Sequence, residues 1–390
     1  MEERYRFIEE WMSDDWSMAE LCRDFGITRK TGYKWLERYQ AAGMEGLRDQ
    51  SRAPLYQALA LSQEDEQRVV EVRLEHRYWG ARKIRAYLER EGTSERIPAV
   101  STIGSILQSR GLTVARKRRL RARANPEPLR DAEAANRVWS ADFKGWFRTG
   151  DGERIDPLTI SDAHSRYLLR CQAVKAADTE HSQPIFEAAF REYGLPERLR
   201  TDNGAPFASN GESGLTKLSV WWIKLGIVPE RIQPGKPQQN GRHERMHRTL
   251  KQATASPPAR NRRVQQERFD QFRQEYNHQR PHEALGQTTP ATHYQVSPRE
   301  YPRRLEEVEY PADWQVRRVA RGGQMRWQGL NVFVAHALEG EAIGLQPLDD
   351  LHWRAWFRFY ELGVLVSHSA RILRPEQWAK RQRQLAEDRQ

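Results

Sequence analysis

Residues 234–251 read PGKPQQNGRHERMHRTLK, and the rest of the chain is organised around this stretch. Pro237 can open a helix, and residues 239–251 can continue it because no proline and no second glycine follow Gly241. At roughly 100° per residue, one face gathers a carboxylate with polar and cationic side chains, namely Asn240, Glu244, His247, Arg248 and Lys251. A second face gathers side chains that are expected to pack inward, namely Met246, Leu250 and Ala253.

Two interpretations of this helix are open. In the simpler one, Glu244 and Arg248 form an ion pair across one turn of a solvated helix. In the other, Glu244 binds a metal ion while its neighbours hold phosphate groups. Two aspartates favour the second interpretation. Asp142 lies in the aromatic-rich, strand-like run 138–147 (VWSADFKGWF), and Asp202 is followed by Asn-Gly, a turn signal at the end of a strand.

Composition and charge narrow the class of protein. The 390 residues are enough for two to four domains, and the formal net charge of +11 favours a polyanionic partner, although ribosomal and membrane-surface proteins are basic too. Without an apolar run near 18 residues or an apolar N-terminal segment, we expect a cytoplasmic protein with no membrane helix. With only Cys22 and Cys171, a disulfide framework and a Cys-pair zinc site are excluded.

The N-terminal region predicts a helix-turn-helix over residues 16–39. Ser17 and Thr28 are the expected caps of its two helices, and Gly26 lies at the turn. An ordinary pair of packed helices fits the segment equally well. In the helix-turn-helix interpretation, the second helix enters the major groove and turns outward Arg29, Lys30, Tyr33 and Lys34. A basic, irregular arm follows over residues 43–54, with Arg48 and Arg52 as expected DNA contacts.

A second helical module is predicted over residues 61–112. Its helices are expected at 62–76, 79–90 and 100–110, where Ser62 and Asp65 begin the first and Ser101 is the expected cap of the third. The run RKRRLRAR at 116–123 follows, and its expected phosphate contacts are Arg116, Lys117, Arg118 and Arg119. Two helical modules in tandem predict two DNA contacts.

Strands and helices then alternate in a particular order. Strands are expected at 138–147, 156–162 and 167–174, a helix at 179–193, a strand at 198–202, a helix at 215–225, a strand at 227–232, and then the Glu244 helix. This is the order of the ribonuclease-H-like fold, in which the first strand, the end of the fourth strand and a later helix converge. Residues 315–373, rich in Trp, Phe and Val with glycine turns, predict a small antiparallel β-barrel.

At this point the sequence resembles the insertion-sequence transposases with an integrase-type catalytic core. The matching motifs are WSADF around Asp142, TDNGAPF at 201–207, PQQNGRHERMHRTLK at 237–251 and YNHQRPHEAL at 276–285, preceded by the arm GLRDQSRAP at 46–54. The resemblance implies a multidomain α/β fold. Its parts are a helix-turn-helix domain with basic arm (1–54), a second helical DNA-binding domain with basic run (61–124), a linker (125–134), a ribonuclease-H-like core (135–300) and a β-barrel (311–375).

The same resemblance implies a catalytic, metal-binding triad of Asp142, Asp202 and Glu244, with Lys251 as the basic residue that follows the glutamate. The interval between Asp202 and Glu244 is longer than the family's usual spacing, and an insertion near 207–214 (FASNGESG) would account for it. The chemistry of phosphodiester cleavage agrees, because two Mg²⁺ ions about 3.5–4 Å apart, held by hard oxygen ligands, supply what it needs. Mn²⁺ is expected to substitute. Asp162 is interpreted as a supporting residue at a strand end.

The expected function is that of a DNA transposase acting as a multimer on double-stranded DNA. It would bind the terminal inverted repeats of an element, cleave there by Mg²⁺-dependent hydrolysis and join the 3′-hydroxyl ends to target DNA, associated with the bacterial nucleoid. A phage or retroelement integrase is one alternative, and the absence of an N-terminal His/Cys zinc motif argues against the retroviral form. A regulator with an inactive core is another, and the intact triad argues against it.

The outward cations of the predicted recognition helix give a first test. Replacing Arg29, Lys30 and Lys34 together with Ala should weaken specific end binding and flatten its salt dependence, because each phosphate contact contributes about 0.9 to the slope of log K against log salt. Footprinting and binding at several salt concentrations measure both effects. An unchanged footprint and slope would assign end recognition to another module.

Overall fold

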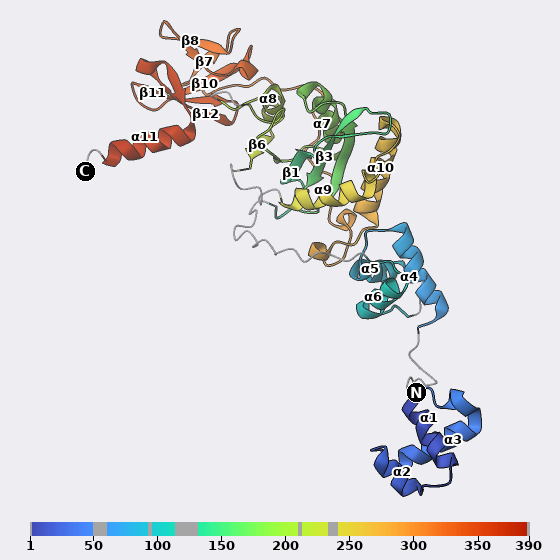
Figure 1. Ribbon diagram of the computed structural model, residues 1–390. Helices are drawn as coiled ribbons and strands as arrows, with labels where there is room; N and C mark the ends of the chain where they lie inside the picture. Colours follow the sequence, from blue (N-terminus) through green and yellow to red (C-terminus); the bar gives the residue numbers. More distant parts are fainter. Residues whose placement is uncertain are drawn as a thin grey trace. The chain divides into compact units, whose positions relative to one another are not determined.

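The computed structural model describes residues 2–49, 61–92, 96–113, 132–209, 213–232 and 241–387 (Figure 1). The chain divides into two compact units, Met1–Leu61 and Ser62–Gln390. None of the helices within the described ranges combines the length and the apolar character that a membrane span requires.

The first unit consists of three helices, α1 (Glu2–Met12), α2 (Met18–Asp24) and α3 (Arg29–Gly46). Ser17 and Thr28 cap α2 and α3 as predicted, whereas α1 was not foreseen. Gly32 lets α3 pack tightly, because a Cβ there would lie 2.5 Å from Cys22 Sγ. The irregular arm was predicted to begin at residue 43, which is too early. Helix α3 is kinked at Ala42–Gly43 and continues to Gly46.

The second unit opens with three more helices, α4 (Gln63–Glu75), α5 (Ala81–Glu91) and α6 (Val100–Ser109). Ser62 caps α4 as predicted, its hydroxyl accepting the Asp65 N–H at 3.0 Å. The predicted cap Ser101 is wrong. Helix α6 begins at Val100, so Ser101 already lies inside it. The N-cap residue is Ala99, whose side chain cannot accept a hydrogen bond. The basic run at 116–123 and most of the linker lie outside the described residues.

A mixed six-stranded sheet forms the centre of this unit, with strand order β2-β3-β1-β5-β6 and β4 paired to the other side of β3. Its strands are β1 (Val138–Phe143), β2 (Phe147–Arg148), β3 (Arg154–Asp162), β4 (Leu168–Val174), β5 (Arg198–Thr201) and β6 (Val228–Arg231). β1, β3 and β4 are antiparallel neighbours, whereas β5 runs parallel to both β1 and β6. The predicted order of strands and helices is thereby confirmed, although the first predicted strand is split into β1 and β2.

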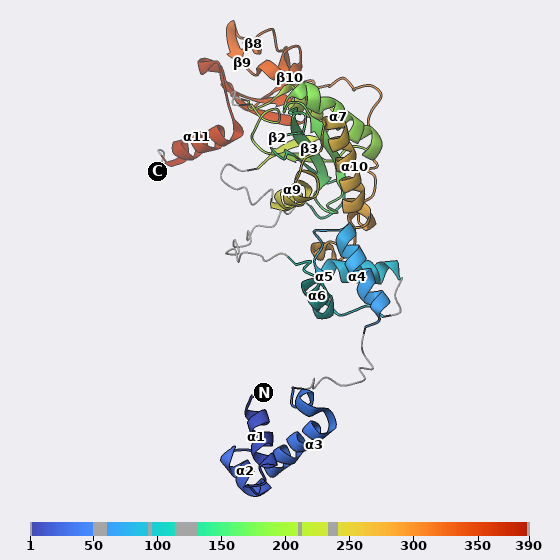
Figure 2. The ribbon, with the colours of Figure 1, turned by 45° about the vertical axis from the view of Figure 1, so that its right-hand side comes forward.

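Helices cover both faces of this sheet (Figure 1 and Figure 2). On one face, α7 (Thr179–Tyr193) and α8 (Lys217–Lys224) share a core with Trp139, Leu158 and Leu199 of the strands. On the other face, α9 (Gly241–Thr254) and α10 (Arg262–His278) contribute Met246, Leu250, Phe269 and Phe272 to a second core. Short 3₁₀ turns η2 (Glu283–Leu285) and η3 (Pro290–Thr292) follow α10. The helix that carries Glu244 is thus held against the sheet that carries Asp142.

The C-terminal part is an antiparallel sheet of five strands in the order β13-β12-β11-β10-β7, with a separate β8-β9 hairpin. The strands are β7 (Gln315–Arg318), β8 (Gln324–Trp327), β9 (Leu330–Phe333), β10 (Ala342–Pro347), β11 (His352–Phe357), β12 (Tyr360–Val366) and β13 (Arg371–Leu373), with the turns η4 (His336–Leu338) and η5 (Ser367–Ser369). The predicted barrel is not confirmed, because among the described strands β7 and β13 remain the two edges of an open sheet. The charged tail forms an unforeseen helix, α11 (Pro375–Glu387).

Helix α8 joins the central sheet to the C-terminal sheet. Its Leu218 and Trp222 belong to the core beneath the central sheet, whereas Val220 and Ile223 belong to the core of the C-terminal sheet. The Lys224 ammonium also pairs with the Glu341 carboxylate at 2.7 Å. The two sheets therefore share one helix between their cores.

Ile223→Ala should destabilise the C-terminal sheet as well as α8. The residue is fully buried, and truncating a buried Ile to Ala costs about 2–5 kcal/mol through lost burial and the cavity left behind. Urea denaturation followed by tryptophan fluorescence measures the shift. The matched control is Val316→Ala, which truncates an exposed residue of the same sheet and should change the midpoint little. Equal effects of the two substitutions would contradict the shared core.

Candidate active site

Asp142 occupies the penultimate position of the central strand β1. Its neighbour across the antiparallel pair is Thr159 of β3, and β1 also pairs in parallel with β5 up to Ser140 opposite Arg200. The Asp142 side chain is 16% exposed, so its carboxylate is accessible from solvent at the end of the strand.

Asp202 follows directly after β5, and its position follows from the same register. Asp142 and Asp202 each lie two residues beyond Ser140 and Arg200, the last paired residues of the parallel β1–β5 ladder. The turn after Asp202 is fastened at two points: the Gly204 N–H donates to Asp202 Oδ1 at 3.1 Å, and the Asn203 amide donates to the Ile232 carbonyl at 2.9 Å. The two aspartates therefore lie at the carboxyl ends of neighbouring parallel strands.

Helix α9 presents two distinct faces. Glu244, Arg248 and Lys251 are exposed, in agreement with the predicted polar face. The predictions for two other residues are wrong: His247 is buried rather than available to DNA, and Ala253 is exposed rather than packed. The buried face is rotated about the helix axis relative to the predicted one. Its residues are His243, Met246, His247, Leu250 and Thr254. Asn240 lies outside the described residues.

The two buried histidines meet at one hydroxyl. Nε2 of His243 and Nε2 of His247 each lie 2.7 Å from Thr159 Oγ1, which donates its own proton to the Asp142 backbone carbonyl at 3.1 Å. A threonine hydroxyl has one proton to donate and two lone pairs, so both imidazoles donate Nε2–H to it. Thr159 thus ties α9 to the strand that carries Asp142. Sequence reasoning missed it, and its only signal is a threonine between the apolar residues Leu158 and Ile160 in the strand RIDPLTISD.

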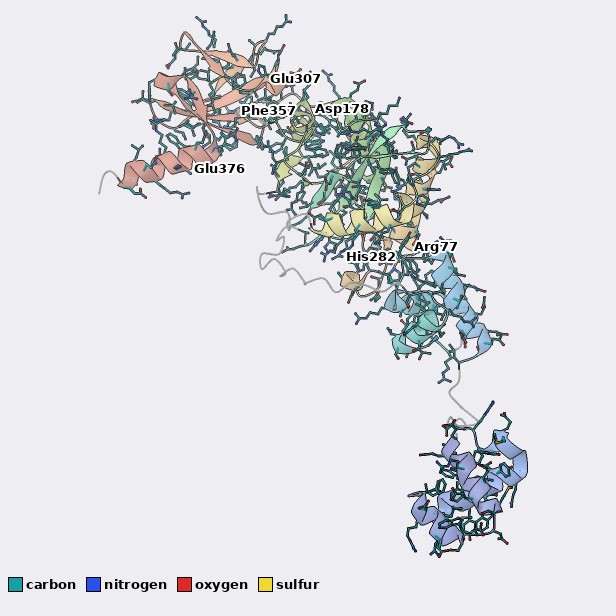
Figure 3. The ribbon with its side chains drawn as sticks, in the orientation of Figure 1. Arg77, Asp178, His282, Glu307, Phe357 and Glu376 are labelled. Atoms are coloured by element: carbon teal, nitrogen blue, oxygen red, sulfur yellow. The ribbon has the colours of Figure 1, made fainter. Side chains whose placement is uncertain are left out.

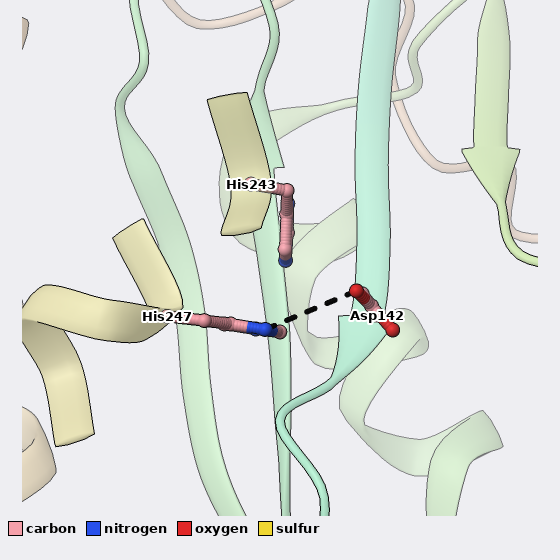
Figure 4. A group of neighbouring side chains, drawn as sticks. All are labelled: Asp142, His243 and His247. Carbon is pink, nitrogen blue, oxygen red and sulfur yellow. Dashed lines mark ion pairs between the residues drawn. The ribbon is translucent and has the colours of Figure 1, made fainter. Parts of the chain in front are cut away.

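Burial determines the charge of these histidines. It lowers the pKa of His243 to about 3, and burial together with the neighbouring His243 and Lys144 lowers the pKa of His247 to about 2. Both rings are therefore neutral at physiological pH. His247 Nδ1 approaches Asp142 Oδ2 at 3.8 Å, the contact dashed in Figure 4. Since a neutral ring with its proton on Nε2 has a lone pair at Nδ1, this approach is a juxtaposition of two bases rather than a salt bridge.

Asp142, His243 and His247 place possible metal-ligand atoms within 4.8 Å of one another (Figure 4). Asp142, Asp202 and Glu244 do not form such a group among the described residues. The Nε2 atoms of both histidines are committed to Thr159, so the possible ligand atoms that remain are the Asp142 carboxylate oxygens and the Nδ1 lone pair of His247, of which a hard divalent cation prefers the oxygens. The donor set at the strand ends fits a divalent cation, and the imidazoles position the elements around it.

Asp162 is buried and makes three hydrogen bonds at the far end of β3. It accepts the Asn136 N–H at 2.8 Å, the Ser165 N–H at 2.7 Å and the Ser165 hydroxyl at 2.6 Å. Burial nevertheless raises the pKa of this carboxyl group above its ordinary value. With its oxygens committed to the β3–β4 turn, Asp162 has the supporting place predicted for it.

The predicted DNA contacts outside the core are only partly described. Arg29, Lys30, Tyr33 and Lys34 are all exposed on α3, and Tyr33 is 56% exposed. Arg48 is exposed and pairs with Glu45 at 3.0 Å. Arg52, Arg116, Lys117, Arg118 and Arg119 lie outside the described residues.

Comparison with known proteins adds family information to this geometry. Two family models described as an integrase core domain match residues 132–237 and 225–290. A model described as a helix-turn-helix domain matches residues 3–54, and one described as a homeodomain-like domain matches residues 31–107.

Individual relatives cover much of the chain. A 31.7 kDa protein of insertion element IS407 from Burkholderia multivorans is 30% identical over 230 residues, which are 57% of this chain and 78% of that protein. A 39.2 kDa protein of insertion element IS476 from Xanthomonas euvesicatoria is 26% identical over 301 residues, 74% of this chain and 80% of that protein. Among solved structures, a chain of a simian T-cell lymphotropic virus intasome matches with a TM-score of 0.37 and 16% identity, covering 75% of this chain and 97% of that chain.

Thr159→Val should destabilise the core because it replaces the shared hydroxyl with a methyl group of similar size. Two buried imidazole N–H groups then lose their acceptor, at about 1–3 kcal/mol each, so the free energy of unfolding should fall by about 2–6 kcal/mol. Chemical denaturation measures the loss. Thr159→Ser keeps the hydroxyl and is the matched control. A valine variant no less stable than the serine variant would show that the two histidines do not depend on this hydroxyl.

Proposed function

The chain belongs to the insertion-element transposases with a retroviral-integrase-type catalytic core, and from that premise we propose that it is a strand transferase with a catalytic triad of Asp142, Asp202 and Glu244. The observation that carries this proposal is the parallel pairing of β1 with β5, which supports Asp142 and Asp202 as a pair because each lies two residues beyond the last paired position. The packing of α9 on the same sheet, through Met246 and Leu250, supports Glu244 as the third carboxylate.

The proposed reaction has two balanced steps. Water first attacks the phosphorus of a phosphodiester bond at an element end, so that one P–O bond forms, the bond to the 3′-oxygen breaks, and a 3′-hydroxyl and a 5′-phosphate result. That 3′-hydroxyl then attacks a phosphodiester of target DNA, where one P–O bond forms as another breaks and a target 3′-hydroxyl leaves. The number of phosphodiester bonds is unchanged in the second step, so no external energy source is needed.

The three carboxylates are proposed to hold two Mg²⁺ ions, for which Mn²⁺ substitutes. When bound, such ions neutralise phosphate charge and favour formation of the attacking oxyanion. The protein's own part is to hold the carboxylates in position, and the bonds from His243 and His247 to Thr159 support that part by anchoring α9 to β3. Because the imidazoles are neutral, they add no positive charge that would compete with the cations.

DNA is proposed to lie along the exposed face of α9. Arg248 and Lys251 follow Glu244 by one and two turns and are exposed, so both can reach phosphates beside the cleaved bond. Asn240, outside the described residues, is proposed as a further contact. The helix-turn-helix unit is proposed to bind the terminal repeat through Arg29, Lys30, Tyr33 and Lys34, aided by Arg48, Arg52 and the run from Arg116 to Arg119. The exposure of the four α3 side chains supports that assignment.

A multimer is proposed as the active form. One triad makes one active site, whereas an element has two ends to join, so concerted insertion needs at least two protomers held together on DNA. Single-molecule counting on a substrate with two ends tests the requirement. A lone protomer that joins both ends would overturn it.

Glu244→Gln should leave DNA binding intact and lower strand cleavage by more than about a hundredfold, since metal-held charge stabilisation is worth several kcal/mol and about 1.4 kcal/mol corresponds to a factor of ten. Cleavage of labelled end DNA with Mg²⁺, and with a chelator, measures the effect. Glu267→Gln is the matched control, because Glu267 lies on the exposed side of α10 and pairs with Arg263. Normal Mg²⁺-dependent cleavage by the Glu244 variant would remove this residue from the active site.

A further inference from the structure

A pocket of about 560 Å³ lies beside the candidate active site, between α5, α9 and the end of α10. Six cationic side chains line it, namely Lys83, Arg166, Arg242, Arg245, Arg248 and Arg280. Only Arg248 has been assigned a role above. The pocket also takes in the segment 276–285, which the proposed reaction leaves without a function. Figure 3 labels His282 of that segment where the α4–α5 module meets the core.

The positive charge of this pocket is not balanced from within. Among the described residues, none of the six cations makes an ion pair with a carboxylate. Two carboxylates line the pocket, and both are engaged elsewhere: Asp162 with Asn136 and Ser165, and Glu283 with Arg82 at 2.9 Å. The six cations therefore line the pocket without a carboxylate partner among the described residues.

Burial makes this arrangement costly for the protein alone. Burial and the neighbouring Arg280 and Arg166 lower the pKa of Lys83 to about 8, against the opposing effect of Glu283. His282 is 7% exposed, and its Nε2 atom has no hydrogen-bond partner in the described part of the chain. Desolvated cations without counter-charges are unfavourable, so a site of this kind is stabilised when an anion enters it.

The dimensions and position of the pocket favour a polymeric anion. Arg242, Arg245 and Arg248 follow one another at three-residue intervals along α9, so they span about 9 Å at a rise of about 1.5 Å per residue. One DNA strand carries a phosphate about every 3.4 Å of helix axis, so the length of this row matches about three successive phosphates. Glu244 lies between the first two of these arginines, which places the row beside the bond to be cut.

We propose that this pocket binds a phosphodiester group of the DNA backbone next to the cleavage site, with Lys83 and Arg280 as its deepest contacts. The inference rests on the proposed function. Arginine forks suit phosphate oxygens, and Lys83 belongs to α5 whereas Arg280 follows α10. Lys83 already donates to the Pro281 carbonyl, and Arg90 donates to the Gln279 carbonyl at 2.9 Å, so the second helical module contacts the core at this place. One phosphate would thus hold the module and the core on the same duplex.

The test uses the full chain with Arg280→Gln and, separately, Lys83→Met. Each variant should bind a duplex bearing the element end about eightfold more weakly at 0.1 M salt, with a salt slope smaller by about 0.9, as expected for one lost phosphate contact. Arg263→Gln, an exposed α10 residue paired with Glu267, is the matched control and should leave both values unchanged. Arg280→Lys keeps the charge and should recover part of the affinity.

Stability without DNA separates a binding role from a structural one. Removing one of several mutually repelling cations should leave the melting temperature unchanged or raise it, while DNA binding falls. Unchanged affinity and slope in both variants would overturn the proposal. Loss of folded protein in both would overturn it as well, because the cations would then be part of the fold.

Two further arms identify the source of the phosphate. Single methylphosphonate substitutions along the duplex should reveal one position that weakens binding of the natural chain but not of Arg280→Gln. In the second arm, pyrophosphate alone is added and the melting temperature is measured. Stabilisation by pyrophosphate, with no position-specific effect of methylphosphonate, would assign the pocket to a free anion and overturn the proposal. Mg²⁺-dependent nicking by the natural chain tests the proposed function separately, since its absence would leave the binding result standing.

Discussion

The position of β1 in the middle of the sheet is the constraint on which the rest of the site depends. β1 is antiparallel to β3 on one side and parallel to β5 on the other, so a single strand fixes Asp142 against Thr159 and also pairs with the strand that Asp202 follows. A shift of one residue in either pairing would turn the side chains of a whole strand to the opposite face. The buried residues Trp139 and Ala141 oppose such a shift, because it would move them out of the core beneath α7. The chemistry at the strand ends is thus held by apolar packing further along the same strand.

The order of the core elements could be predicted from sequence because each has a strong local signal. α7 begins and ends at the predicted residues, since Asp178 caps it and Gly194 follows it. The rotation of α9 could not be predicted in the same way. His243 and His247 are polar by composition, so an amphipathic pattern places them outside, and only the partner hydroxyl on β3 makes their burial favourable. The open C-terminal sheet was also beyond local signals, because closure depends on whether the first and last strands meet.

The same distinction holds for the site. Motifs predicted three carboxylates, and two of them lie at the ends of the paired strands β1 and β5. The Thr159 contacts and the cationic pocket depend on residues distant in sequence, which no spacing rule connects. Lys83 and Arg280 are separated by most of the core along the chain, yet both line one pocket. The clustering of positive charge in this protein is therefore a property of the assembled fold, in addition to the basic segments that the sequence displays.

Because α8 packs in the cores of both sheets, the catalytic core cannot be cleanly separated from the C-terminal sheet by truncation. Val220 and Ile223 belong to the C-terminal core although they lie in the chain well before position 300. A fragment that stops at the predicted end of the catalytic core would expose these side chains to water, together with Leu215. Such a fragment would have an exposed apolar patch on α8 that favours aggregation. Self-association of an isolated core would therefore reflect this exposed patch rather than the assembly of the intact protein.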